Sequence, residues 1–404
     1  MRTSLKSIAI IQRHIPHYRV ALFSALEAEA QRFGYRLTVF SGRDNTQQRM
    51  PFAHCALPMH HVGFSTQGPG WLAGLEQALA GSDVIVAPHE LHCLSIPYLW
   101  MRRRQLCSSW IWWGHGYNFQ ASTQHPIYHW VANSIKGFLV ARANGMITYT
   151  QGGAQYWRER GMPADQILPF LNTIDVEGLW QKSSQVTETS LAEARERLGL
   201  RNKKILLFSG RLYAEKQVDF LLQALAHVQQ ACPDTALLIL GDGEERPRLE
   251  ALCRRLHLHD VHFLGEITDT IESSVYFKLA QLLVIPGLVG LAIVHGFAFN
   301  LPLITTQRNF HSPEIEYLSE HNGSMTAHHP QAYAAEINRV LSSPAQYNTM
   351  QEQAGETARQ LTLSASATRF MLAIDRFTNP SVPVANDRRR YERTALGSPH
   401  TAAR

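Results

Sequence analysis

The chain of 404 residues is poor in cysteine and in charge. Its cysteines form no CxxC pair and have no metal-ligand spacing; they are Cys55, Cys93, Cys107, Cys232 and Cys253. We interpret them as small buried hydrophobes of a reducing compartment, so neither a structural disulfide nor a zinc site is expected. Charged residues make up 18% of the chain and hydrophobic residues 45%. This composition is typical of a globular protein and not of a disordered one.

Long apolar runs are also scarce. The first run, Ile8 to Ile11, has four residues, which is shorter than the ~7–15 residues of a signal-peptide core. The segment Ile285 to Ile304 is the nearest to a membrane span, but it contains His295, Asn300 and two prolines. We therefore interpret it as a buried strand, turn and helix, and we expect a cytoplasmic protein.

Basic residues exceed acidic ones only in the first 190 residues, which hold 16 Lys and Arg against 11 Asp and Glu, while the rest holds 22 of each. No basic stripe interleaves with aromatics, so nucleic acid is not an expected partner. Arg102 to Arg104 directly follow the apolar stretch Leu94 to Met101. They could contact anionic headgroups peripherally at the inner face of the membrane, or form a solvated helix end, and both alternatives remain open.

Short apolar segments alternate with helix-length stretches along the chain, which predicts parallel sheets in an α/β fold. The first series opens with Ile8–Ile11 and a helical pattern over Tyr18–Phe33. Its further expected strands are Arg36–Phe40, Val84–Ala87, Trp110–Trp113 and Gly145–Tyr149. The expected strands of the second series are Ile205–Ser209, Ala236–Leu240, Val261–Leu264, Leu282–Ile285 and Leu301–Thr305.

The length fits two doubly wound domains of roughly 180 residues each. A polar run, Gln181 to Ser190, separates the two series. We therefore predict an N-terminal domain over residues 1–185, a linker over 186–200 and a C-terminal domain over 201–380. The Pro-, Asn-, Arg- and Ser-containing tail, 381–404, has no apolar period and is expected to be disordered.

The strongest chemical signal is the segment FSGRLYAEKQVDFLLQAL, residues 208–225. It places Gly210, Arg211 and Lys216 on a predicted turn between a strand and a helix. Two cations beside the positive end of a helix dipole are what a diphosphate requires. Taken alone, the segment is equally well explained by a surface loop with two ordinary cations.

Three further blocks follow in order: LLILGDGEERPRLE (237–250), VHFLGEITD (261–269) and IPGLVGLAIVHGFAFNLPLITT (285–306). Together with GR-x3-EK they resemble the C-terminal donor domain of glycosyltransferase family 4, over nearly all of residues 200–375. The resemblance implies a GT-B fold, in which two Rossmann-like, doubly wound parallel-sheet domains face a cleft. It also implies a retaining transfer from a nucleotide-diphosphate sugar to a saccharide or lipid-linked saccharide in cell-surface polysaccharide synthesis.

The resemblance gives Arg211 and Lys216 two roles, namely binding the donor diphosphate and stabilising it as the leaving group. It extends the donor site to residues of the turns and of the helix-opening segment: Gly210, Gly243 of the GDG turn, Gly265 near the nucleobase, Gly290 and Leu291. The chain departs from the family at the two donor-loop glutamates, whose matching positions are Gly287 and His295. A neutral His295 could still bond a ribose hydroxyl, and Glu314 could replace the sugar contact or be a first-turn helix carboxylate after Pro313.

In the first half, WIWWGHGYNF (110–119) and the loop around His14 resemble family members more loosely. His115 lies between two glycines at a predicted strand end, where it could bond a sugar hydroxyl or the charge developing at the anomeric centre; otherwise it is a structural histidine. The expected acceptor-side residues are His14, His17, Tyr18 and Arg19, on loop position alone.

No Asp-x-Asp follows an apolar strand, so we expect no bound metal and no cofactor beside the nucleotide-sugar co-substrate. Two other functions remain open. A sugar-nucleotide epimerase shares the fold and the ligand. A catalytically inactive glycosyltransferase-like subunit would account for Gly287 and His295.

Overall fold

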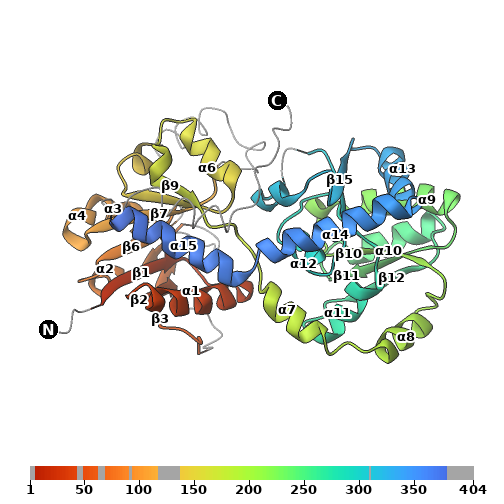
Figure 1. Cartoon of the computed structure of the whole chain (residues 1–404), viewed down its shortest axis with the longest axis horizontal. Coiled ribbons are helices and arrows are strands. Elements are labelled where there is room, and N and C mark those ends of the chain that lie inside the picture. Colours follow the sequence, from red (N-terminus) through yellow and green to blue (C-terminus); the bar gives the residue numbers. More distant parts are fainter. Residues whose placement is uncertain are drawn as a thin grey trace. The chain divides into compact units, whose positions relative to one another are not determined.

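The chain folds into two α/β units, each built on its own parallel sheet (Figure 1). The computed structural model describes residues 5–42, 49–61, 69–90, 93–116, 137–308 and 311–379. Within these ranges the first unit comprises the chain up to Ile174 and from Leu363 onward, and the second comprises Asp175–Thr362. The predicted α/β fold class with two doubly wound parallel sheets is confirmed.

The sheet of the first unit has seven strands in the order β3-β2-β1-β6-β7-β8-β9, all paired in parallel. Its strands are β1 (Lys6–Gln12), β2 (Tyr35–Gly42), β3 (His54–Leu57), β6 (Val84–Pro88), β7 (Ser109–Gly114), β8 (Gly145–Thr148) and β9 (Ile167–Pro169), with a separate hairpin of β4 (Met59–His61) and β5 (Gly70–Leu72). Its helices are η1 (His17–Arg19), α1 (Val20–Arg32), α2 (Leu75–Ala78), α3 (Ser95–Met101), α4 (Arg103–Leu106), α6 (Gln151–Arg158), η3 (Ala164–Gln166) and α15 (Leu363–Thr378).

Strand β7 shows how this sheet is buried on both faces. Its side chains alternate, as the period of a strand requires. Ile111 and Trp113 join the core cluster that also holds α1 and α15, whereas Trp110 and Trp112 join the cluster on the other face. All three tryptophans are 1% exposed. A fully buried strand of this kind reads as a continuous apolar run, which is why the sequence predicted it correctly.

The sheet of the second unit has six strands in the order β12-β11-β10-β13-β14-β15. Its strands are β10 (Lys204–Ser209), β11 (Thr235–Leu240), β12 (Val261–Gly265), β13 (Leu282–Val284), β14 (Leu303–Thr306) and β15 (Gly323–Thr326). Its helices are α7 (Val176–Ser183), α8 (Glu188–Arg197), η4 (Ala214–Lys216), α9 (Val218–Ala231), α10 (Arg246–Arg255), α11 (Thr270–Leu279), α12 (Ala292–Ala298), η5 (Pro313–Tyr317), α13 (Pro330–Leu341) and α14 (Pro344–Gln360). In each unit the strand order reverses beside the first strand, and ligands of such sheets bind at the carboxyl ends near that reversal.

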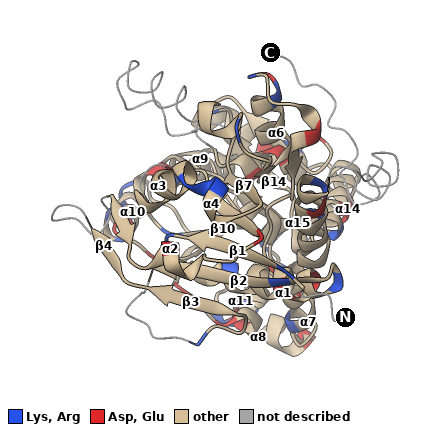
Figure 2. Cartoon of the chain, turned by 90° about the vertical axis from the view of Figure 1, so that its left-hand side faces the viewer, with Lys and Arg blue, Asp and Glu red and all other residues tan. Residues whose placement is uncertain are grey.

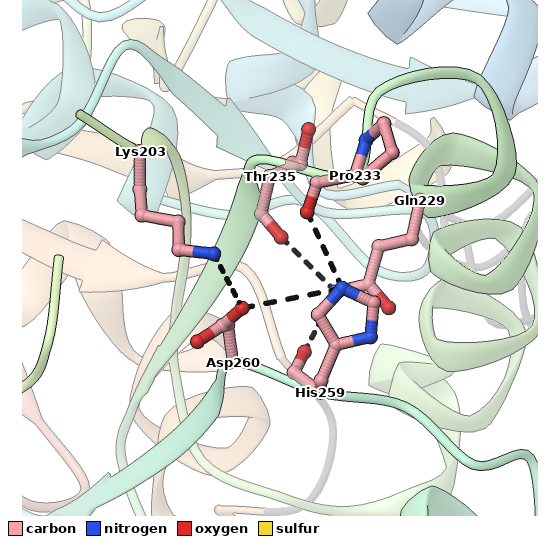
Figure 3. A network of polar contacts seen from close by, with 6 residues as sticks. All are labelled: Lys203, Gln229, Pro233, Thr235, His259 and Asp260. Atoms are coloured by element: carbon pink, nitrogen blue, oxygen red, sulfur yellow. Dashed lines mark hydrogen bonds and ion pairs between the residues drawn. The ribbon is translucent and has the colours of Figure 1, made fainter. Parts of the chain in front are cut away.

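The amino ends of β10, β11 and β12 are joined by polar contacts (Figure 3). Lys203 forms a 2.8 Å ion pair with Asp260. The Gln229 amide donates to the carbonyl oxygens of Thr235 (3.0 Å) and His259 (2.6 Å). These contacts link the three strands at one edge of the sheet, whereas the opposite, carboxyl edge carries the predicted site.

The division between the units differs from the predicted one. The segment 186–200 is no extended linker, because it contains α8, whose N-terminus is closed by a capping box of Thr187 and Ser190. Helices α7 and α8 both belong to the second unit: Trp180 donates to the Ala298 carbonyl (2.9 Å) and Arg197 to the Tyr276 hydroxyl (2.8 Å). The polar run that suggested a linker is the solvent face of these helices, so the boundary lies at Ile174.

Helix α15 was predicted as part of the C-terminal domain, and this assignment was wrong. The helix packs along α1 in the first unit (Figure 1), where Phe370 and Ile374 are fully buried. Ser366 donates to the Leu171 carbonyl (2.7 Å). An apolar period predicts a helix but does not name the surface that the helix covers. The predicted tail, 381–404, lies outside the described residues.

Candidate functional site

The predicted strand-turn-helix around Lys216 is present at the carboxyl end of β10. Gly210 follows the strand with φ +151° and donates its N–H to the Leu240 carbonyl at 3.0 Å. Lys216 ends η4, and Gln217, with φ +53°, directly precedes α9. Gly210 and Lys216 lie side by side: a Cβ on Gly210 would stand 3.5 Å from the lysine Cε and 3.7 Å from its Nζ.

Lys216 is a buried cation with a carbonyl as its hydrogen-bond partner. Its side chain is 8% exposed, and Nζ donates to the Leu288 carbonyl oxygen at 2.7 Å. Burial lowers the pKa of Lys216 to about 8, so the lysine is still charged at pH 7. A shift of this size costs the folded state roughly 3 kcal/mol at neutral pH. No carboxylate of the described chain forms an ion pair with it, so the charge is available to an anionic ligand.

Arg211, on the same turn, is exposed. Its side chain makes no hydrogen bond or ion pair with the residues that the structure describes. One buried and one exposed cation therefore flank Gly210 at the strand end. This is the arrangement that the sequence predicted for a diphosphate, and the roles of both residues remain predictions.

The loop after β13, residues 285–290, lies directly against this turn. Leu288 donates its N–H to the Glu215 carbonyl at 2.8 Å. A Cβ on Gly287 would stand 2.2 Å from that same carbonyl oxygen, which real contacts essentially never allow. The position matched to the first family glutamate thus has no room for any side chain. A glycine is required at position 287 because the backbone of Glu215 and Lys216 packs directly against it.

His311 holds the same loop from the other side. It is 3% exposed. Its Nε2 lies 2.8 Å from the Thr306 carbonyl oxygen, and the Val289 N–H donates to its Nδ1 at 3.2 Å. These partners assign the neutral tautomer with the proton on Nε2. Burial lowers the pKa of His311, and the nearby charges of Arg308 and Lys216 lower it further. No motif of the sequence marked this residue, because its role arises from the fold of the loop.

Gly243, in the turn after β11, and Gly265, the last residue of β12, lie at the same sheet edge as Gly210. A Cβ on Gly243 would stand 2.2 Å from the Leu212 carbonyl oxygen, so this glycine permits close backbone packing. Gly265 has φ +75° and accepts a 2.8 Å hydrogen bond from the Gly241 N–H. The three predicted glycines, Gly210, Gly243 and Gly265, are thus brought together at the carboxyl edge of β10, β11 and β12.

Gly290, Leu291 and His295 lie in and before α12. Gly290 has space for a Cβ, since its nearest neighbour would be Ser312 Oγ at 3.5 Å. Leu291 is the N-cap residue of the helix. The His295 ring stacks on Phe277 of α11 at 4.1 Å, and its buried Nε2 has no hydrogen-bond partner in the described part of the chain.

Burial lowers the pKa of His295 to about 4, so the ring is neutral at pH 7. The contacts that the structure gives it are aromatic, and the predicted ribose bond remains a prediction. Glu314 is 4% exposed in the first turn of η5, after Pro313. Its position fits the helix-turn alternative, and its sugar contact also remains a prediction.

The first unit has a second cluster at the carboxyl ends of its strands. The Arg19 guanidinium donates to the Tyr149 hydroxyl at 2.5 Å and to Gln12 Oε1 at 3.4 Å. It also lies 4.9 Å from the centroid of the Trp113 ring. The His115 ring stands edge-on to Tyr149 at 4.1 Å. Arg19 and His115, predicted separately, therefore share Tyr149, which the sequence analysis did not select.

His115 is exposed, and its role, in sugar transfer or in structure, remains a prediction. Its flanking glycines are tightly packed: a Cβ on Gly116 would stand 2.6 Å from the Gly153 Cα of α6, and one on Gly114 3.1 Å from the His89 Cβ. The turn that carries the imidazole is therefore fixed by close backbone contacts.

The other predicted acceptor-side residues, His14, His17 and Tyr18, are exposed. Of these, His17 and Tyr18 contact each other edge-on at 5.9 Å. In the part of the chain that the structure describes, no three His, Cys, Asp or Glu side chains are grouped so that they could hold a metal ion. None of the described helices is long and apolar enough to cross a membrane.

Comparison with known proteins supports the resemblance. Residues 192–360 match the family of glycosyl transferases group 1. The alpha-D-kanosaminyltransferase of Streptomyces kanamyceticus is 34% identical over 127 residues, which are 30% of this chain and 33% of that protein. A GDP-mannose-dependent alpha-(1-6)-phosphatidylinositol dimannoside mannosyltransferase of Mycobacterium tuberculosis is 28% identical over 156 residues, or 38% of this chain and 39% of that protein. The matched segments span between a third and two fifths of these relatives.

Among solved structures, HepE of Anabaena in complex with UDP and glucose superimposes with a TM-score of 0.69 at 17% identity, covering 92% of this chain and 99% of that one. This likeness concerns the fold. The two parallel-sheet units thus have the GT-B fold, and residues 192–360 of the second unit match the family of glycosyl transferases group 1.

Proposed function

We propose that this protein transfers a sugar from a nucleoside-diphosphate sugar to a saccharide or lipid-linked acceptor, with retention of anomeric configuration, in the synthesis of a cell-surface polysaccharide. The observation that carries the proposal is Lys216, a buried ammonium with no described carboxylate partner at the carboxyl edge of the second sheet. Its unfavourable burial is explained if a diphosphate supplies the missing negative charge. The family match over residues 192–360 supports the same reaction class.

Arg211 contributes the second charge. Because it is exposed and has no described partner, it can move onto the diphosphate without breaking an existing ion pair. A charge-assisted hydrogen bond of this kind contributes ~1.5–3 kcal/mol. We assign no cofactor beside the donor, and the two cations stabilise the departing diphosphate in place of a metal.

The test uses matched lysines of the second unit. Lys204 also donates to a backbone carbonyl, that of Leu341 at 3.3 Å, but it lies at the amino end of β10. Titration with UDP and GDP should show that Lys216→Met and Arg211→Ala each weaken binding by ~1.5–3 kcal/mol, whereas Lys204→Met leaves the affinity unchanged. Equal affinities in all four proteins would remove the proposed donor site.

The reaction class needs a separate readout. Release of free nucleoside diphosphate that depends on an added acceptor indicates transfer, and release without acceptor would favour the epimerase alternative. Nucleotide binding without any turnover would favour the inactive subunit. The anomeric configuration of the product, measured by NMR, tests retention.

We further propose peripheral contact with an anionic membrane through α3, α4 and residues 137–142 of the first unit. Leu94, Tyr98 and Met101 follow at four- and three-residue spacing on one face of α3, and Met101 is 68% exposed. Phe138 is 52% exposed and Arg142 lies over its ring at 3.7 Å. Helix α4, which directly follows α3, carries arginines (Figure 2). Basic residues next to an apolar face are typical of helices that lie in a lipid interface.

Flotation with vesicles tests this contact. The full chain should bind vesicles that contain phosphatidylglycerol and not pure phosphatidylcholine vesicles. Met101→Ser combined with Phe138→Ser should abolish binding, whereas Leu5→Ser, which changes a 58% exposed leucine outside this face, should not. Binding that is indifferent to Met101 and Phe138 would contradict the assignment.

A further inference from the structure

The cluster around Arg19 contains a positive charge that no carboxylate of the described residues balances. Arg19 Nε is buried and has no hydrogen-bond partner among the residues that the structure describes. Its terminal nitrogens donate to neutral oxygens, the Tyr149 hydroxyl and the Gln12 amide. In the described ranges no carboxylate lies within ion-pair distance of this guanidinium.

Arg19 is partly buried, and an arginine withdrawn from solvent is usually paired with a carboxylate. Arg246 of the second unit shows the usual pattern: its side chain is 30% exposed and has two carboxylate partners, Asp242 at 2.7 Å and Glu250 at 2.8 Å. Arg19 has instead the rings of Trp113 and Tyr149, at 4.9 and 5.2 Å from its guanidinium carbon. These rings and the hydroxyl orient the guanidinium, but they do not neutralise it.

The position of the cluster is that of a ligand site. Gln12 ends β1, Tyr149 follows β8, and His115 follows β7, so all lie at the carboxyl edge of one sheet. The strand order reverses between β1 and β6, and open α/β sheets bind ligands outside the carboxyl ends at such a reversal. Arg19 ends η1, the short helix after β1, and its guanidinium reaches Tyr149 beyond β8.

We propose that Arg19 binds an oxyanion of the acceptor, a phosphate or a carboxylate, so that the acceptor substrate is an anionic saccharide or a saccharide phosphate. The identification of the bound molecule as the acceptor rests on the proposed function, but the anion site itself does not. A planar guanidinium held by aromatic rings presents fixed N–H groups to such an oxyanion. His115, which contacts the same Tyr149 ring, then lies beside the bound group.

The experiment separates this site from the donor site by using the full chain with Lys216→Met. This protein is titrated with glucose 1-phosphate, glucuronate and neutral glucose, followed by ligand-observed NMR. The phosphate and carboxylate arms identify the oxyanion, and glucose measures binding that needs no charge. We expect one of the two anions to bind and glucose not to bind.

Adding Arg19→Gln should weaken the binding of that anion by about 10- to 100-fold, the usual effect of losing a charge-assisted pair. Arg160→Gln is the matched control, because Arg160 lies over the Tyr156 ring at 3.5 Å in the same unit. If Arg19→Gln does not fold, Arg19→Lys can replace it. This variant keeps the charge but loses the planar set of N–H donors, and should weaken binding to a smaller extent. The proposal is overturned if neither anion binds, or if anion binding is unchanged in the Arg19 variants. UDP binding by the unaltered chain reports on the proposed donor site independently.

Discussion

The buried ammonium of Lys216 donates to the Leu288 carbonyl oxygen at 2.7 Å and thereby joins the turn after β10 to the loop after β13. The hydrogen bond satisfies one of three N–H donors of the lysine. The energetic cost of the buried charge remains, and it gives the donor site a dependence on pH.

We expect nucleotide binding to take up a proton at pH 8.5. In the free protein burial lowers the pKa of Lys216 to about 8, so at this pH the ammonium is mostly deprotonated. A bound diphosphate favours the charged form and raises this pKa, so affinity falls as the pH rises through 8. Calorimetry of UDP binding in two buffers of different ionisation enthalpy should give an uptake of roughly half a proton or more per UDP bound. Lys216→Met should remove this uptake. If the variant takes up as many protons as the wild type, the uptake belongs to another group.

The free energy of unfolding depends on the same pKa shift of Lys216. The folded pKa of Lys216 lies below its ordinary value of 10.5, so the unfolded chain binds more protons between pH 8 and 10.5. The contribution of this group to the free energy of unfolding therefore rises with pH across that window. Denaturant titrations of the wild type and Lys216→Met at pH 7.5 and 9.5 should show this rise only in the wild type.

His115 should act in the transfer step. It is exposed on a turn that backbone contacts of Gly114 and Gly116 hold in place. His115→Ala should therefore lower turnover by ~10²–10⁴-fold, with donor affinity and melting temperature nearly unchanged. Single-turnover rates and melting curves on the same variant check this. A destabilised protein with a near-normal rate per folded molecule would show that the residue is structural.

Gly287 and Gly290 make a matched pair in the donor loop. A Cβ on Gly287 meets the Glu215 carbonyl oxygen at 2.2 Å, whereas one on Gly290 has Ser312 Oγ at an ordinary 3.5 Å. We expect Gly287→Ala to displace the loop from Lys216, with a loss of UDP affinity and a lower melting temperature. Gly290→Ala should alter both far less. Similar behaviour of the two variants would show that the close approach at Gly287 is not needed.

Divalent metal should not be required for transfer, because the two cations Arg211 and Lys216 are assigned the charge of the leaving diphosphate. Activity should survive EDTA at a concentration that removes all Mg²⁺. A complete loss that magnesium restores would show that a metal shares this charge.

The sequence alone determined those features that depend on local pattern. The apolar segments predicted the central strands of both sheets, because a strand buried on both faces is apolar at every position. The segment with Gly210, Arg211 and Lys216 predicted a strand, a turn and a helix, because these features depend on residues that are adjacent in the sequence. The alternation of strands and helices predicted two doubly wound units.

Only the tertiary structure decided which distant segments meet. Helix α15 packs on α1 in the first unit, although its sequence neighbour α14 belongs to the second, because an apolar face does not specify its partner. His311 becomes a support of the donor loop only when β14 lies beside β13. Tyr149 joins Arg19 to His115 across strands that are far apart in the chain. The burial of Lys216, and with it the lowered pKa, likewise arises from the loop that folds over it, which no local pattern encodes.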